Sequence, residues 1–238
     1  MNGAVASDRK FSGLGLRVLS ALAMAPLMVA LILAGGWWFM GLMFVAALVS
    51  LYEWYGLARA GRHAVAVLAA GLVYLGVSYA SYVGLRFSFD CGAWLALAVV
   101  LCVWASDIGG YFAGKFIGGP KMAPKLSPRK TWAGLSGAML SSALMLGALH
   151  QSGEYLFKYL NTDTGLIVPD TWLPVLVAGA LLGLVGQIGD ISISFLKRRV
   201  GVKDTGNLIP GHGGLLDRID ALLLVAPVFF VLCLAFLP

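Results

Sequence analysis

The chain has 238 residues, of which 60% are hydrophobic and 12% charged. A soluble domain carries about 25% charged residues, so this composition excludes a water-soluble globular protein. The net charge of +6 alone would fit a nucleic-acid binder, but the placement of the basic residues, described below, gives it another role. The three cysteines (Cys91, Cys102 and Cys233) lie singly in or near apolar stretches without zinc-ligand or redox spacing, so we interpret them as small apolar side chains.

Seven apolar stretches are long enough to cross about 30 Å of hydrocarbon, which takes roughly 20 helical residues. They lie near 17–35, 37–58, 64–85, 92–114, 131–149, 172–196 and 219–237. They lack the alternation of a membrane β-barrel, and a helix satisfies its own backbone hydrogen bonds in lipid. The sequence therefore predicts an all-α fold, a polytopic membrane helical bundle of about seven transmembrane helices in one integral membrane domain, 1–238.

The first stretch follows Arg9, Lys10 and Arg17, as the apolar part of a signal peptide would. Its length, and the interfacial pair Trp37-Trp38 that follows it, favour an uncleaved first helix instead.

Basic residues mark the cytoplasmic side of a membrane protein. With a cytoplasmic N-terminus and seven spans, all but two of the 17 Lys and Arg residues fall in cytoplasmic segments, and the exceptions are Arg86 and Lys158. The basic surplus then sets the topology and faces anionic lipids and solutes, so no nucleic acid is expected as a partner. Cytoplasmic loops are predicted near 115–130 and 197–218.

Two aspartates, Asp107 and Asp190, lie inside or at the inner end of apolar stretches. An ionisable group at membrane depth is costly and therefore a functional candidate, although a structural pair with a lysine from a neighbouring helix would also explain it. Asp190, Ser194 and Lys197 follow each other at helical spacing and share one face. Asp107, Tyr111 and Lys115 repeat this spacing.

The glycine-rich run 190–220 continues with Asp217 and Asp220, which share a helix face. Carboxylates beside many cations suit Mg²⁺ that bridges phosphate oxygens. Glycines in the loop permit a backbone cup for an anion, but a plain turn after Pro210 would explain Gly211, Gly213 and Gly214 equally well. His212 by itself fits a turn residue.

Two blocks of residues resemble the phosphatidate cytidylyltransferases, also called CDP-diglyceride synthetases. The longer one is Ser194-x-Leu196-Lys197-Arg198-x4-Lys203-Asp204-x-Gly206-x2-Ile209-Pro210-x-His212-Gly213-Gly214-Leu215-x-Asp217-Arg218-Ile219-Asp220. The other is Asp107-x-Gly109-x-Tyr111, followed by Ser127-Pro128-x-Lys130-Thr131-Trp132-x-Gly134. The similar segments cover roughly 104–135 and 186–220. The chain departs from the family at Ile193 and Ala133, where Glu is common, and at Ile108 and Gly110, where small polar residues and Ala are usual.

The resemblance implies a reaction of phospholipid biosynthesis in which CMP passes from CTP to phosphatidic acid, giving CDP-diacylglycerol and pyrophosphate with Mg²⁺. We expect the metal ligands to be Asp190 and Asp217, and leave a second cation open. The expected catalytic residues are Asp190, Asp217, Lys197, Lys203 and Asp220, and the expected substrate-binding residues are Lys130, Ser194, Arg198, His212, Arg218 and Asp107.

By the same resemblance, 1–90 would supply N-terminal helices and 91–238 the catalytic ones. We expect a multi-pass protein of a bacterial inner (plasma) membrane, with an active site that faces the cytoplasm and takes phosphatidic acid from the inner leaflet. A homodimer is an open expectation.

Three other functions compete with this one. An ion-coupled transporter would also carry intramembrane aspartates, but it predicts symmetric broken helices in two halves, whereas the polar residues here gather at one side and in the later half. A lipid-alcohol kinase or another CTP-using membrane enzyme would lack the complete signature. A membrane scaffold gives no reason for aspartates among lysines.

Overall fold

Six long apolar helices dominate the computed structural model, which describes residues 15, 20, 22–61, 63–124, 126–159, 172–206, 208 and 213–237, with only the backbone of 154–159. Each of the six is long and apolar enough to cross a membrane, which confirms the polytopic helical bundle. They are α2 (Gly36–Ala60), α3 (Ala64–Phe87), α4 (Gly92–Phe116), α5 (Trp132–Tyr159), α6 (Trp172–Arg199) and α7 (Leu216–Phe236).

The expected first span, 17–35, is represented among the described residues by the shorter apolar helix Leu22–Ala34. Thirteen helical residues reach about 20 Å, less than the roughly 30 Å of a hydrocarbon layer. Six of the seven expected spans are thus confirmed, and the seventh stays a prediction because 1–14, 16–19 and 21 lie outside the described residues.

The expected loop near 115–130 contains a small antiparallel hairpin, β1 (Lys121–Ala123) and β2 (Ser127–Thr131). These strands were not predicted from the sequence. Pro120, Pro124 and Pro128 prevent a continuous helix here, because proline lacks the N–H that a helix needs. The second strand leads directly into α5 and carries Lys130 toward the bundle.

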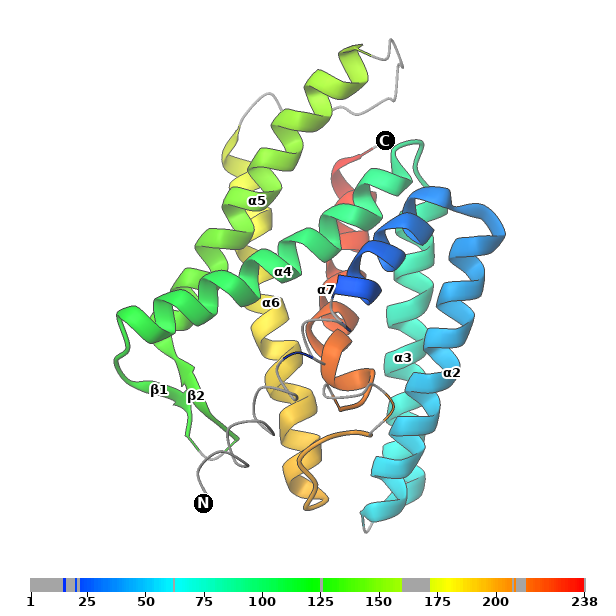
Figure 1. Ribbon diagram of the computed structural model, residues 1–238, viewed down its shortest axis with the longest axis vertical. Coiled ribbons are helices and arrows are strands. Elements are labelled where there is room, and N and C mark those ends of the chain that lie inside the picture. The colour runs from blue at the N-terminus through cyan, green and yellow to red at the C-terminus, as the bar shows by residue number, and fades with distance from the viewer. Residues whose placement is uncertain are drawn as a thin grey trace, which may run out of the picture.

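Both hairpin strands, the turn between α2 and α3 and the loop between α6 and α7 lie at the lower end of the bundle in Figure 1. The described basic residues at this end are Arg59, Lys115, Lys121, Arg129, Lys130, Lys197, Arg198, Arg199, Lys203 and Arg218, and Arg86 lies near the opposite end. The structure therefore gathers the basic residues at one end of the bundle, as the charge pattern predicts. We call this the basic end.

Glycines set the close approach of the later helices. An added Cβ on Gly109 of α4 would collide with Ser141 of α5, and one on Gly183 of α6 would lie 2.7 Å from the carbonyl oxygen of Ala138. Lipid gives apolar helices no hydrophobic reason to associate, so close packing of small residues has to hold them together.

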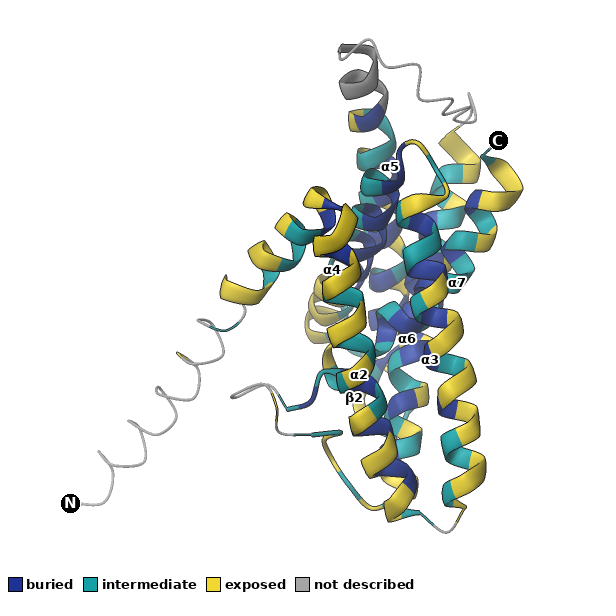
Figure 2. Ribbon diagram, turned by 90° about the vertical axis from the view of Figure 1, so that its right-hand side faces the viewer, coloured by how far each residue is buried: buried dark blue, intermediate teal, exposed yellow. Residues whose placement is uncertain are grey.

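The outer faces of α2 and α3 are lined by exposed residues, and the buried residues lie at the centre around α6 (Figure 2). Large apolar side chains such as Val65, Val73 and Leu140 are more than half exposed, as expected for residues that face lipid. A separate buried cluster joins four helices near the basic end, and its members are Trp54, Leu57, Leu75, Ile193, Leu216 and Leu223. This cluster packs together the helices that carry the candidate site.

Candidate active site

The first part of the site is built around Asp190 on α6. Its Oδ2 lies 2.6 Å from Nζ of Lys130, which the hairpin delivers from the other matching block. Its Oδ1 accepts a hydrogen bond of 3.2 Å from Ser194, one helical turn further along. Nζ of Lys130 also donates to the carbonyl oxygen of Gln187 over 3.4 Å. Because 32% of the Asp190 side chain is still exposed, the carboxylate keeps room for a further ligand.

Two more carboxylates lie close to Asp190. An added Cβ on Gly189 would come within 2.7 Å of the carbonyl oxygen of Asp220, so α6 and α7 touch at this level. Asp220 and Asp107 both experience the negative charge of Asp190 and, between them, the positive charges of Lys130, Arg218 and Lys197. We call Asp107, Asp190 and Asp220 the carboxylate cluster.

The second part of the site is built around Asp217, in the first turn of α7. Its Oδ1 lies 2.6 Å from Nζ of Lys197, which leaves the Asp190 face of α6 and crosses to α7. Its Oδ2 accepts hydrogen bonds from the backbone N–H groups of Thr205 (2.8 Å) and Gly214 (3.1 Å). Both carboxylate oxygens therefore already have donors.

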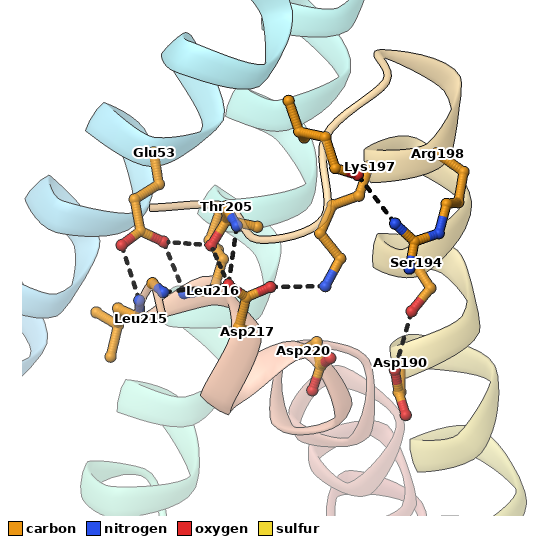
Figure 3. A network of polar contacts seen from close by, with 12 residues as sticks. Glu53, Asp190, Ser194, Lys197, Arg198, Thr205, Leu215, Leu216, Asp217 and Asp220 are labelled. Atoms are coloured by element: carbon orange, nitrogen blue, oxygen red, sulfur yellow. Dashed lines mark hydrogen bonds and ion pairs between the residues drawn. The ribbon is translucent and has the colours of Figure 1, made fainter. Parts of the chain in front are cut away.

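Glu53 of α2 completes this second part (Figure 3). It is only 4% exposed and accepts hydrogen bonds from the backbone N–H groups of Leu215 (2.7 Å) and Leu216 (2.9 Å). The first N–H groups of a helix have no partner within it, and its N-terminus favours a negative charge, so Glu53 fastens α7 at its start. We call Glu53, Lys197, Thr205 and Asp217 the latch.

Thr205 links the two acids of the latch. Its Oγ1 lies 2.8 Å from Oε2 of Glu53 and 3.1 Å from Oδ2 of Asp217. A hydroxyl has a single proton and therefore serves one carboxylate at a time. The loop that carries the signature residues is thus tied to α2 and α7 together.

Glu53 and Thr205 were not predicted from the sequence as residues of the site. An acid inside the apolar stretch 37–58 was available as a signal, since the same rule had marked Asp107 and Asp190. Thr205 offered no signal, because a lone threonine in a loop is ordinary.

Other expected site residues lie at the margin. Arg198 is exposed and donates to the carbonyl oxygen of Val202 over 3.2 Å, and Lys203 is exposed on the loop. Lys115 reaches the hydroxyl of Tyr111 over 3.4 Å on an exposed face. His212 lies outside the described residues.

Ile193, one of the departures from the family pattern, is buried in the cluster beneath α7 with Trp54 and Leu216. An apolar side chain at this position packs among its apolar neighbours, whereas a buried glutamate there would need a charged or hydrogen-bonding partner.

Within the described part of the chain, no three His, Cys, Asp or Glu side chains already form a metal-binding group. Mg²⁺ does not need one, because it usually takes one or two carboxylates and completes its shell with phosphates and water. The part-exposed Asp190, with Asp107 and Asp220 close by, fits this requirement.

Comparisons with known proteins agree with this chemistry. A curated relative from Rickettsia bellii (strain RML369-C), named phosphatidate cytidylyltransferase, is 34% identical over 227 residues, which cover 95% of this chain and 93% of the relative. A relative of the same name from Rickettsia felis (strain ATCC VR-1525 / URRWXCal2) is 33% identical and covers 90% of each chain. One from Brucella suis biovar 1 (strain 1330), also of that name, is 39% identical over 68% of this chain and 55% of the relative. Residues 60–236 match the cytidylyltransferase family, to which the chain therefore belongs.

Proposed function

We propose that this protein is a phosphatidate cytidylyltransferase, which transfers CMP from CTP to phosphatidic acid and releases pyrophosphate. The relatives that cover almost the whole chain carry this name. The observation that carries the proposal is the ion pair of 2.6 Å between Lys130 and Asp190, because it joins the two matching blocks in one site at the basic end of a membrane bundle.

In the proposed reaction, an oxygen of the lipid phosphate forms a bond to the α-phosphorus of CTP. The bond from that phosphorus to the oxygen that bridges to the β-phosphorus breaks, and pyrophosphate leaves with the electron pair. Such transfers depend mainly on positioning and on neutralising charge. Lys130, Lys197 and Arg218 lie around the carboxylates and are proposed to hold the phosphates of the two substrates.

We propose Mg²⁺ as the cofactor, which when bound would neutralise phosphate charge and orient the triphosphate. Asp190 would supply one ligand. Asp217 is the second ligand that the sequence predicts, and it can serve only if Lys197 releases Oδ1. Asp220 already shares the charged environment of Asp190 and lies within the same cluster. A lysine that left Asp217 would be placed to hold phosphate instead.

The orientation in the membrane is also proposed. The basic end would face the cytoplasm of a bacterial inner membrane, because basic segments are retained on that side. CTP would then arrive from the cytoplasm, and phosphatidic acid from the inner leaflet.

The test uses purified protein in detergent with CTP, Mg²⁺ and phosphatidic acid, and measures pyrophosphate together with the lipid product. We expect turnover by the wild type, and in Asp190→Asn a loss of at least roughly a hundredfold, the size of effect seen when one charge-stabilising group is removed from an active site. Asp90→Asn is the matched control, because Asp90 is exposed between α3 and α4, away from the basic end. Full activity of Asp190→Asn would overturn the site, and an inactive wild type would overturn the function.

A further inference from the structure

A cavity of about 480 Å³ opens beside the carboxylate cluster. Its wall is made by the helix Leu22–Ala34 and by α2, α3, α4 and α7, so most of it comes from the first half of the chain. Well-packed interiors leave few voids larger than a water molecule, and a space of this size falls within the usual range for ligand sites.

Among the described residues that line this cavity, two are charged, Asp107 and Arg218, and they lie at one end. The charge of Arg218 acts on Asp107. From Arg218 the lining continues along α7 to Ala226, a distance of about 12 Å at the rise of a helix. The opposite wall carries Ile32 and Leu42, far from the basic end.

Three polar side chains along the apolar part of the wall, Ser78, Tyr79 and Tyr82, already have hydrogen-bond partners. Ser78 donates to the carbonyl oxygen of Leu223 over 2.6 Å, and the hydroxyl of Tyr82 donates to Ala96 over 3.0 Å. The hydroxyl of Tyr79 lies 2.8 Å from Oγ of Ser50. The wall therefore offers a ligand mainly hydrocarbon, which excludes the ribose and triphosphate of a nucleotide as the occupant.

We propose that this cavity is the acyl-chain site of the lipid substrate. One acyl chain lies along α7 between the Leu22–Ala34 helix and α3, and the phosphate of the same lipid reaches Arg218 at the charged end. Arg218 directly follows Asp217 of the latch, and the carboxylate cluster adjoins it, so a lipid seated in this way presents its phosphate to the reaction. The inference rests on the proposed function and names the part of the site that selects the lipid.

Ala46 of α2 is the residue whose size should limit the chain. It lines the cavity with a short side chain, so Ala46→Phe would fill space without adding charge. Ala80→Phe on α3 is the matched control, because Ala80 is exposed and does not line the cavity. Met43→Ala changes the same wall in the opposite direction.

The first measurement is kcat/KM for phosphatidates with short and long saturated chains, at saturating CTP. We expect Ala46→Phe to lower the long-to-short ratio by roughly tenfold, the effect of one or two methylenes in an apolar pocket. Met43→Ala should raise the ratio, Ala80→Phe should leave it unchanged, and the KM for CTP should stay constant in all three. A wild-type ratio in both active cavity variants would overturn the proposal while leaving the proposed function intact.

The second measurement does not need turnover. Phosphatidate with a photoactivatable group near the end of one acyl chain is crosslinked to the full-length protein in detergent, and the labelled peptides are identified by mass spectrometry. We expect label on the Leu22–Ala34 helix and on the first half of α2, and its loss from these segments in Ala46→Phe. Label spread evenly over the exposed faces of all helices would show ordinary lipid solvation and would overturn the proposal, whether or not the enzyme is active.

Discussion

The latch and the carboxylate cluster lie side by side at the start of α7 and handle negative charge in opposite ways. In the latch, Glu53 and Asp217 receive hydrogen bonds from backbone N–H groups, from Thr205 and from Lys197. In the cluster, Asp107, Asp190 and Asp220 act on one another, and Asp190 forms an ion pair with Lys130. The carboxylates of the latch, which have hydrogen-bond donors, hold a loop in place. The carboxylates of the cluster repel one another and would be stabilised by a cation.

The strongest test of this difference is Asp220→Asn. We expect turnover to fall by roughly a hundredfold, because one negative charge next to the proposed cation is lost. Without Mg²⁺, and at a pH high enough to ionise all three carboxylates, the same variant should unfold at a higher temperature than the wild type, because the repulsion among three like charges is reduced. Turnover and thermal unfolding in detergent with a chelator measure the two effects.

Asp217→Asn is the counterpart in the latch. It should unfold at a lower temperature than the wild type under the same conditions, because the largely buried Lys197 would lose its charged partner. If the two variants shifted the unfolding temperature in the same direction, the distinction between latch and cluster would fail.

Glu53→Ala should have the largest effect on stability. The buried N–H of Leu216 and the part-buried N–H of Leu215 lose their acceptor, and such a loss costs about 1–3 kcal/mol for a buried group. We therefore expect the free energy of unfolding to fall by about 3 kcal/mol, with a loss of turnover because Asp217 and Arg218 follow the released residues. Reversible unfolding in detergent provides the measurement.

Glu53→Gln is the conservative comparison. The amide oxygen can still accept a hydrogen bond from one of the two backbone N–H groups, but the NH₂ group is itself a donor and cannot accept from the other. About half of the stability lost in Glu53→Ala should therefore be recovered. Equal stability of the alanine variant and the wild type would show that α7 does not depend on Glu53.

The bundle itself follows from the sequence for a physical reason. Lipid demands about 20 apolar residues per crossing, so the six long helices could be located from hydrophobicity alone. The spacing of Asp190 and Ser194 also predicts that they share a helix face, because neighbours within one helix depend only on the helical repeat, and the two side chains form a hydrogen bond there.

Contacts between elements could not be predicted in the same way. Lys197 shares a helix face with Asp190 by spacing, yet it pairs with Asp217, because a long side chain at a helix end can turn to either neighbour. Glu53 accepts a hydrogen bond from the N–H of Leu215, which lies 162 positions further along the chain. Nothing in the sequence around either residue indicates this contact. The assignment of Asp217 as a metal ligand stays a prediction that the variants above address.

A smaller effect should come from Gly189→Ala, which tests how closely the cluster is held. Its Cβ would lie 2.7 Å from the carbonyl oxygen of Asp220, so α6 and α7 must separate. Overpacking of this kind costs about 1–3 kcal/mol, and the shift of Asp190 from Asp220 should also raise the Mg²⁺ concentration needed for half-maximal turnover. Gly186→Ala is the matched control, since its Cβ would meet Val225 at an ordinary 3.5 Å. Identical Mg²⁺ titrations for both variants would argue against a cation between these helices.

The smallest effect is expected at Arg198, which the sequence predicts to bind substrate. The side chain is exposed and already donates to Val202, so any attraction for phosphate acts through water and is weakened by salt. We expect Arg198→Ala to raise the KM for CTP by no more than roughly threefold, the scale of an exposed ionic contact, and the difference to disappear at high ionic strength. Arg199→Ala is the control, because its guanidinium lies over the ring of Phe195, 5.5 Å from the centroid. A loss above tenfold that persists at high salt would instead place Arg198 against the substrate, and would extend the site beyond the latch and the cluster.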